Sequence, residues 1–73
     1  MDRSLAEQRL AHAQRHITEG KRHIANQRDL IARLKEQGHD TRFAQNLLEQ
    51  FELVLASHIA DRDRIMAELV GRP

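Results

Sequence analysis

The chain has 73 residues, no cysteine, two phenylalanines and a formal net charge of +1. So short a chain forms one small domain, and the lack of cysteine excludes disulfides, thiolate metal ligands and thiol catalysis. The scarcity of aromatic residues argues against a single-stranded nucleic-acid platform, and the absence of an apolar leader or of a run near 20 apolar residues predicts a soluble, cytoplasmic protein.

A first long helix is predicted over residues 4–37. The segment "SLAE" fits a capping box, with Ser4 as the cap and Glu7 reaching back to it. Apolar residues then recur every seven positions, and smaller or polar residues occupy the second position of the same heptad. The first set is Leu10, Ile17, Ile24 and Ile31, and the second is Ala13, Gly20, Gln27 and Leu34. This spacing is typical of a helix that packs along one narrow seam.

A tight turn is predicted at residues 38–40, followed by a second helix over 41–70. Gly38 suits the left-handed conformation found just after a helix, and Asp40 or Thr41 can cap the next one. Gly71 and then Pro73 mark the end of the second helix. The sequence therefore predicts an all-α fold, a long antiparallel two-helix hairpin in a single domain over residues 1–73.

Folding the chain back at Gly38 predicts which residues face each other. The expected register sets Gly20 against His58, Gln27 against Phe51 and Ala13 against Ile65, with small residues meeting large ones. In this interpretation Gly20 provides the room that His58 occupies.

The second helix carries more apolar residues than one neighbouring helix can cover. We therefore expect a homodimer of hairpins that forms a four-helix bundle. The predicted packing and dimer core consists of Ile17, Gly20, Ile24, Ile31, Leu47, Phe51, Val54, His58 and Ile65.

Three histidines and a carboxylate, His12, His16, Glu19 and His23, share one strip of the first helix. The favoured interpretation is that they border the seam and that no cofactor is bound. The alternative is a site for a transition metal or haem at His16, Glu19, His23 and His58, since imidazole and carboxylate are common metal ligands. His58 lies within the apolar face, and we favour a structural role for it over a metal ligand or a pH switch.

The pattern "HITEGKRHIANQRDLIARL", then "GHDT", then "LLEQFELVLASHIADRDRI" resembles a group of small bacterial helical proteins without an assigned activity. That resemblance extends from about Leu5 to Leu69 and implies a bacterial, cytoplasmic protein. It assigns no role to any residue.

We expect the function to be binding to another protein chain rather than catalysis. No hydroxyl side chain has an evident catalytic base, and acidic residues dilute the basic face that nucleic-acid binding needs. We expect a non-enzymatic oligomerisation module whose partner is itself or another helical protein, without membrane or nucleic-acid binding. A histidine-based metal- or haem-binding bundle is the alternative.

Overall fold

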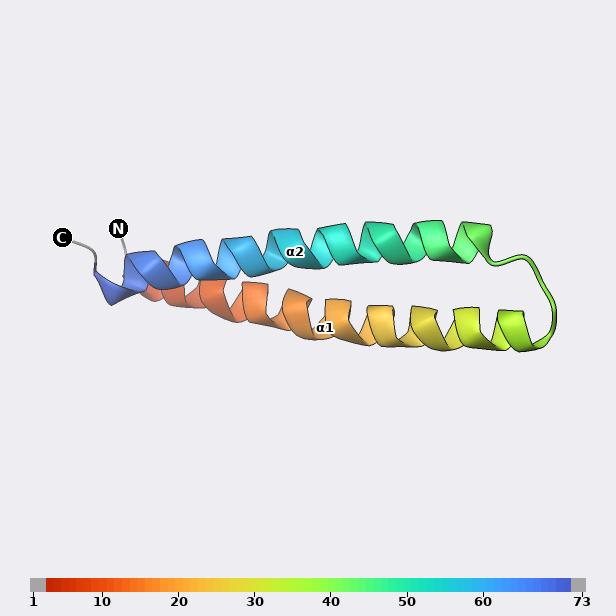
Figure 1. The fold of residues 1–73 in the computed structure, drawn as a ribbon. Coiled ribbons are helices and arrows are strands. Elements are labelled where there is room, and N and C mark those ends of the chain that lie inside the picture. Colours follow the sequence, from red (N-terminus) through yellow and green to blue (C-terminus); the bar gives the residue numbers. More distant parts are fainter. Residues whose placement is uncertain (1–2, 72–73) are drawn as a thin grey trace.

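The computed structural model describes residues 3–71 and consists of two helices, α1 over Arg3–Glu36 and α2 over Arg42–Val70. They run antiparallel side by side and are joined by a short loop, as Figure 1 shows. The hairpin measures 56 × 16 × 13 Å. The predicted all-α helical hairpin is confirmed, and the observed ends of the helices lie within one residue of those expected. Pro73, predicted to follow the second helix, lies outside the described residues.

The connecting loop has the predicted glycine and a side-chain hydrogen bond to the first residue of α2. Gly38 adopts φ +75°, and the backbone N–H of His39 donates to the carbonyl of Leu34 at 2.9 Å. The carboxylate of Asp40 accepts from the backbone N–H of Arg42 at 2.9 Å and from its guanidinium at 2.6 Å. Those hydrogen bonds from Arg42 hold the pKa of Asp40 below its ordinary value. Thr41 occupies the N-cap position of α2 without a side-chain capping hydrogen bond, and Asp40 lies one residue before it.

At the other end of α1, Ser4 does not occupy the N-cap position predicted for it. The helix begins at Arg3, so Ser4 lies inside its first turn. Glu7 lies 3.7 Å from Nε of Arg3. The end of α2 follows the prediction, since Gly71 has φ +80° and its N–H donates to the carbonyl of Glu68.

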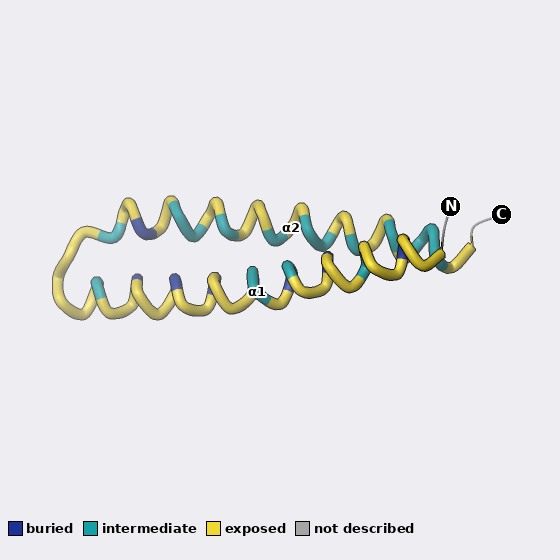
Figure 2. The backbone as a smooth tube through the Cα atoms, turned by 180° about the vertical axis from the view of Figure 1, so that it is seen from behind, coloured by how far each residue is buried: buried dark blue, intermediate teal, exposed yellow. Residues whose placement is uncertain are grey.

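The heptad predicted for α1 forms its buried side. In Figure 2 the buried positions of α1 lie on the side that faces α2. The buried residues of α1 are Ala6, Ala13, Ile17, Ile24, Gln27 and Ile31. All of them belong to one heptad seam, which confirms that this periodicity reports the packing face of the helix.

The packing face of α2 is less deeply covered. Ala44 is its only buried residue among those described, while Phe51, Leu55, His58 and Ile65 are half-buried. Val54, predicted to lie in the core, is 54 % exposed. Within the hairpin, Leu55 rather than Val54 packs toward α1.

The predicted pairing of Gly20 with His58 is wrong, because Gly20 faces Leu55, three residues earlier in α2. A Cβ atom on Gly20 would lie 3.3 Å from Cδ1 of Leu55, so Leu55, not His58, occupies the space that the glycine leaves. Gln27, which was expected to face Phe51, donates from Nε2 to the carbonyl oxygen of Ala44 at 2.8 Å. Both contacts restrict the alignment of the two helices. Leu55 fits beside position 20 because glycine has no side chain, and the buried amide of Gln27 needs the carbonyl of Ala44 as its partner.

Replacing Gly20 with alanine is expected to raise the free energy of unfolding. Alanine is favoured over glycine in a helix interior by about 1 kcal/mol. The new Cβ meets the side chain of half-buried Leu55, whose Cδ1 at 3.3 Å has to yield by a few tenths of an ångström, while its Cβ at 3.7 Å is in ordinary contact. We expect a net gain smaller than the full propensity difference, measured by urea denaturation followed by circular dichroism. A loss of stability would instead show that Leu55 is held rigidly against Gly20.

Neither α1 nor α2 is long and apolar enough to cross a membrane. This finding concerns the described part of the chain.

Candidate functional site

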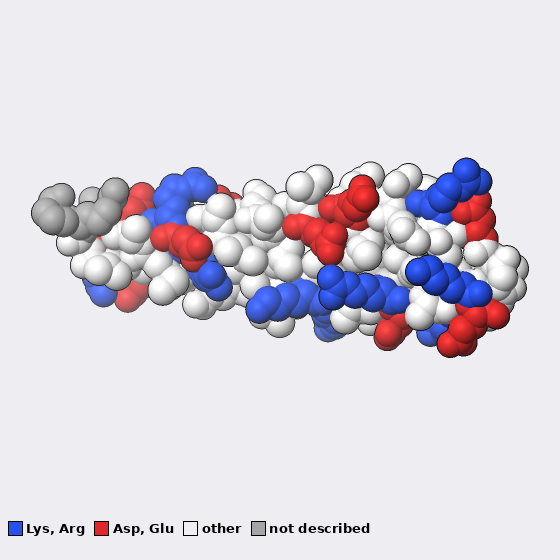
Figure 3. Space-filling view, viewed as in Figure 1, with Lys and Arg blue, Asp and Glu red and all other residues white. Residues whose placement is uncertain are grey.

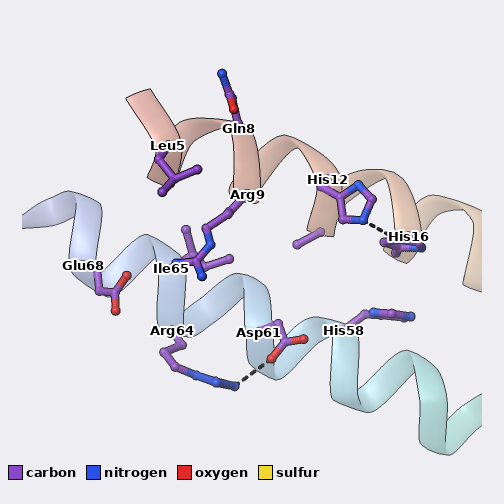
Figure 4. Close-up of a pocket in the computed structure, with 11 residues that line it drawn as sticks. Leu5, Gln8, Arg9, His12, His16, His58, Asp61, Arg64, Ile65 and Glu68 are labelled. Carbon is purple, nitrogen blue, oxygen red and sulfur yellow. Dashed lines mark hydrogen bonds and ion pairs between the residues drawn. The ribbon is translucent and has the colours of Figure 1, made fainter. Parts of the chain in front are cut away.

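A groove of about 700 Å³ lies between α1 and α2 in the half of the hairpin farther from the loop. Figure 4 shows its side chains, which come from both helices. Three histidines line it together with charged and apolar residues. The full lining is Leu5, Gln8, Arg9, His12, Ala13, His16, His58, Asp61, Arg64, Ile65 and Glu68.

His12 and His16 lie one turn apart on α1 and their rings meet edge to face. The two Nε2 atoms are 2.8 Å apart, and the ring planes are inclined by 87°. At this distance one Nε2 carries a proton and donates it to the lone pair of the other. Two imidazole nitrogens therefore lie within hydrogen-bond distance of each other at the edge of the groove.

Two further groups lie beside the ring of His16. His58 of α2 stacks on it with centroids 4.7 Å apart and planes within 8° of parallel. On the other edge of the ring, Nδ1 of His16 lies 3.7 Å from Oε1 of Glu19. A carboxylate on this side favours the tautomer with a proton on Nδ1, which leaves Nε2 of His16 as the acceptor for His12.

The structure divides the residues of the predicted metal site. His16, Glu19 and His58 come together as expected, but His23 lies against Phe51 with ring centroids 6.1 Å apart. His12, which the sequence places on the same strip, is the histidine that joins the cluster. Its spacing of four residues from His16 was the signal that could have identified it.

Within residues 3–71 no group of three or more His, Cys, Asp or Glu side chains is arranged to hold a metal ion. The carboxylate of Asp61, across the groove, is already engaged, since it accepts from the guanidinium of Arg64 at 2.7 Å. The cluster therefore consists of two converging nitrogens, one stacked ring and one carboxylate behind them.

A second feature is an apolar patch on the same side of the hairpin, nearer the loop. It consists of Leu30, Phe43, Leu47 and Val54, and we call it the loop-half patch. Phe43 is 77 % exposed, Val54 54 % and Leu30 37 %, and Leu47 is half-buried.

Heptad spacing places the loop-half patch on the groove side. Leu30 follows His16 by two heptads, and Val54 and Leu47 precede Asp61 by one and two heptads. His16 and Asp61 both line the groove, so residues at these intervals project to the same side of their helices. One side of the hairpin thus carries an apolar half and a histidine-lined half.

No family model, curated protein or solved structure matches this chain. The resemblance to small bacterial helical proteins stays a hypothesis, and any functional argument rests on the geometry of the hairpin itself.

Proposed function

We propose that the chain is a non-enzymatic self-association module, in which two hairpins pack side to side as a four-helix bundle. The observation that carries this proposal is the surface that one hairpin leaves uncovered. A compact chain of 8.5 kDa exposes about 4,700 Å², whereas this hairpin exposes 5666 Å². No large side chain among the described residues is fully buried, because two helices alone cannot enclose a core.

The loop-half patch supports the groove side of the hairpin as the side that packs against the second copy. Its three most exposed members, Leu30, Phe43 and Val54, gain most from removal from water, at about 25 cal/mol per Å² of apolar surface. The side that carries them is 56 Å long and 16 Å wide. A side of this size can bury the roughly 800 Å² that each partner contributes to a standard interface.

The distribution of charge favours a second copy of this chain as the occupant. α1 carries eight basic and four acidic side chains, whereas α2 carries three basic and five acidic ones. On the face shown in Figure 3, basic side chains follow α1 in the half nearer the loop. α1 of one copy is therefore attracted to α2 of the other and repelled by α1 of the other.

This charge pattern also favours one arrangement of the two hairpins. When α1 lies beside the partner's α2 about a two-fold axis parallel to the helices, both loops lie at the same end of the bundle. The two loop-half patches then face each other and cover one another.

Two measurements test the proposal. Sedimentation equilibrium is expected to give twice the 8.5 kDa mass of one chain. Because the chain has no cysteine, a Gln37→Cys variant carries a single spin label in the loop. Electron–electron distance measurements are expected to give one separation well below the 56 Å length of the hairpin.

The outcomes that count against the proposal differ for its two parts. A monomer at all concentrations would reject self-association and favour another helical protein as the partner. A dimer whose labels lie about one hairpin length apart would retain self-association and reject the shared loop end.

A further inference from the structure

We propose that His12 and His16 form a chelate for a divalent transition-metal ion, with Cu²⁺ the best fit. This inference goes beyond self-association, because both ligands belong to α1 of one chain. Its basis is the separation of 2.8 Å between the two Nε2 atoms. Two imidazoles four residues apart on a helix present their nitrogens to the same ion, a pairing that zinc sites on helices also use.

The separation of the nitrogens indicates the class of ion. At a metal–nitrogen distance of about 2.0 Å, two nitrogens 2.8 Å apart subtend about 90° at the metal. Adjacent positions in square-planar and octahedral coordination have this angle, whereas tetrahedral coordination needs a wider one. Tetragonal nitrogen sites are typical of Cu²⁺ and Ni²⁺, and Cu²⁺ binds most tightly in the divalent series.

Binding requires only one proton to move. With Glu19 favouring a proton on Nδ1 of His16, Nε2 of His12 is the donor in the metal-free hydrogen bond. When the ion binds, this proton passes through solvent to Nδ1 of His12, and both Nε2 lone pairs then coordinate the metal. Both imidazoles stay neutral, as metal ligation demands.

The other residues of the cluster position the chelate. Glu19 lies behind Nδ1 of His16, where a carboxylate orients a metal-bound imidazole and increases its basicity. His58 does not supply a third nitrogen, because its ring is within 8° of parallel to that of His16 and in-plane lone pairs of parallel rings do not converge. The stacked ring of His58 instead restricts rotation of the His16 ring.

The remaining coordination positions face solvent. His12 is exposed and the groove is open beside it, so water completes the coordination sphere (Figure 4).

The test is a titration of the full chain with Cu²⁺, followed by electron paramagnetic resonance and by thermal unfolding. We expect nitrogen hyperfine splitting and a rise in Tm, because the chelate forms only when α1 is helical. His12→Gln and His16→Gln are each expected to remove the nitrogen signal and the rise in Tm. Glu19→Gln is expected to retain the signal and weaken binding roughly tenfold.

His23→Gln is the matched control, since His23 lies on the same strip but contacts Phe51. It is expected to bind Cu²⁺ as tightly as the unaltered chain. Equal loss in the His23 and His12 variants, or retention of the signal in His12→Gln, would overturn the proposal. Circular dichroism of each variant, which reports helix content without metal, separates loss of the site from loss of the fold.

Discussion

Replacing Ile24 with alanine is expected to lower the free energy of unfolding by about 2–5 kcal/mol. Ile24 is 7 % exposed and lies in the middle of the seam between the helices. Three of the six buried apolar residues are alanines, so Ile17, Ile24 and Ile31 supply most of the apolar surface that the hairpin buries. Small domains are stable by only about 5–15 kcal/mol, and this one substitution therefore removes a large share.

The measurement is urea denaturation followed by helical circular dichroism, and Leu53→Ala is the control. Leu53 is 71 % exposed. Its truncation to alanine removes about as much apolar side chain as Ile24→Ala, but water already reaches most of that surface in the folded hairpin. We expect a change within about 0.5 kcal/mol for it. Similar losses for Ile24→Ala and Leu53→Ala would contradict the seam described here.

The sequence predicted the packing face of α1 well, because its large buried residues recur in one heptad. Ile17, Ile24 and Ile31 have no competing apolar heptad beside them, so only one side of the helix can be buried. The loop could be predicted equally well, since Gly38 follows the last turn of α1 and Asp40 precedes α2. Local chemistry fixes both features, and local chemistry is visible in a sequence.

The packing face of α2 could not be predicted with the same accuracy. Apolar residues occur there in adjacent pairs, Leu47 with Leu48 and Val54 with Leu55, and one member of each pair fits either of two neighbouring faces. Which member turns inward depends on the partner helix. The contact of Leu55 with Gly20 decides the question, and that contact joins residues far apart in the chain.

The contacts of the histidine cluster also differ in how well the sequence predicts them, according to whether they lie within one helix or between two. The proximity of His12 and His16 follows from helical spacing alone and was within reach of sequence reasoning. The neighbours of His58 depend on the register, and a shift of four residues along α1 replaces Gly20 with His16 as its partner. A site within one helix can be read from the sequence, whereas a site across two helices needs their alignment.

Replacing Val54 with glutamate is expected to convert the dimer into a monomer at micromolar concentrations. Val54 is 54 % exposed in the single hairpin and lies in the loop-half patch. In the proposed bundle, the substitution places a carboxylate in an apolar interface, and two-fold symmetry places two of them there. Each desolvated charge costs several kcal/mol, and each 1.4 kcal/mol weakens association tenfold.

Leu53→Glu is the matched control, with the same new side chain one residue away. Leu53 is more exposed than Val54, at 71 % against 54 %, so exposure alone would make it the more damaging site for association. Heptad spacing instead points Leu53 away from α1 and outside the loop-half patch. Sedimentation equilibrium is therefore expected to show a monomer for Val54→Glu and a dimer for Leu53→Glu. The reverse result would move the interface to the outer face of α2, where the histidine-lined groove would lie far from the partner.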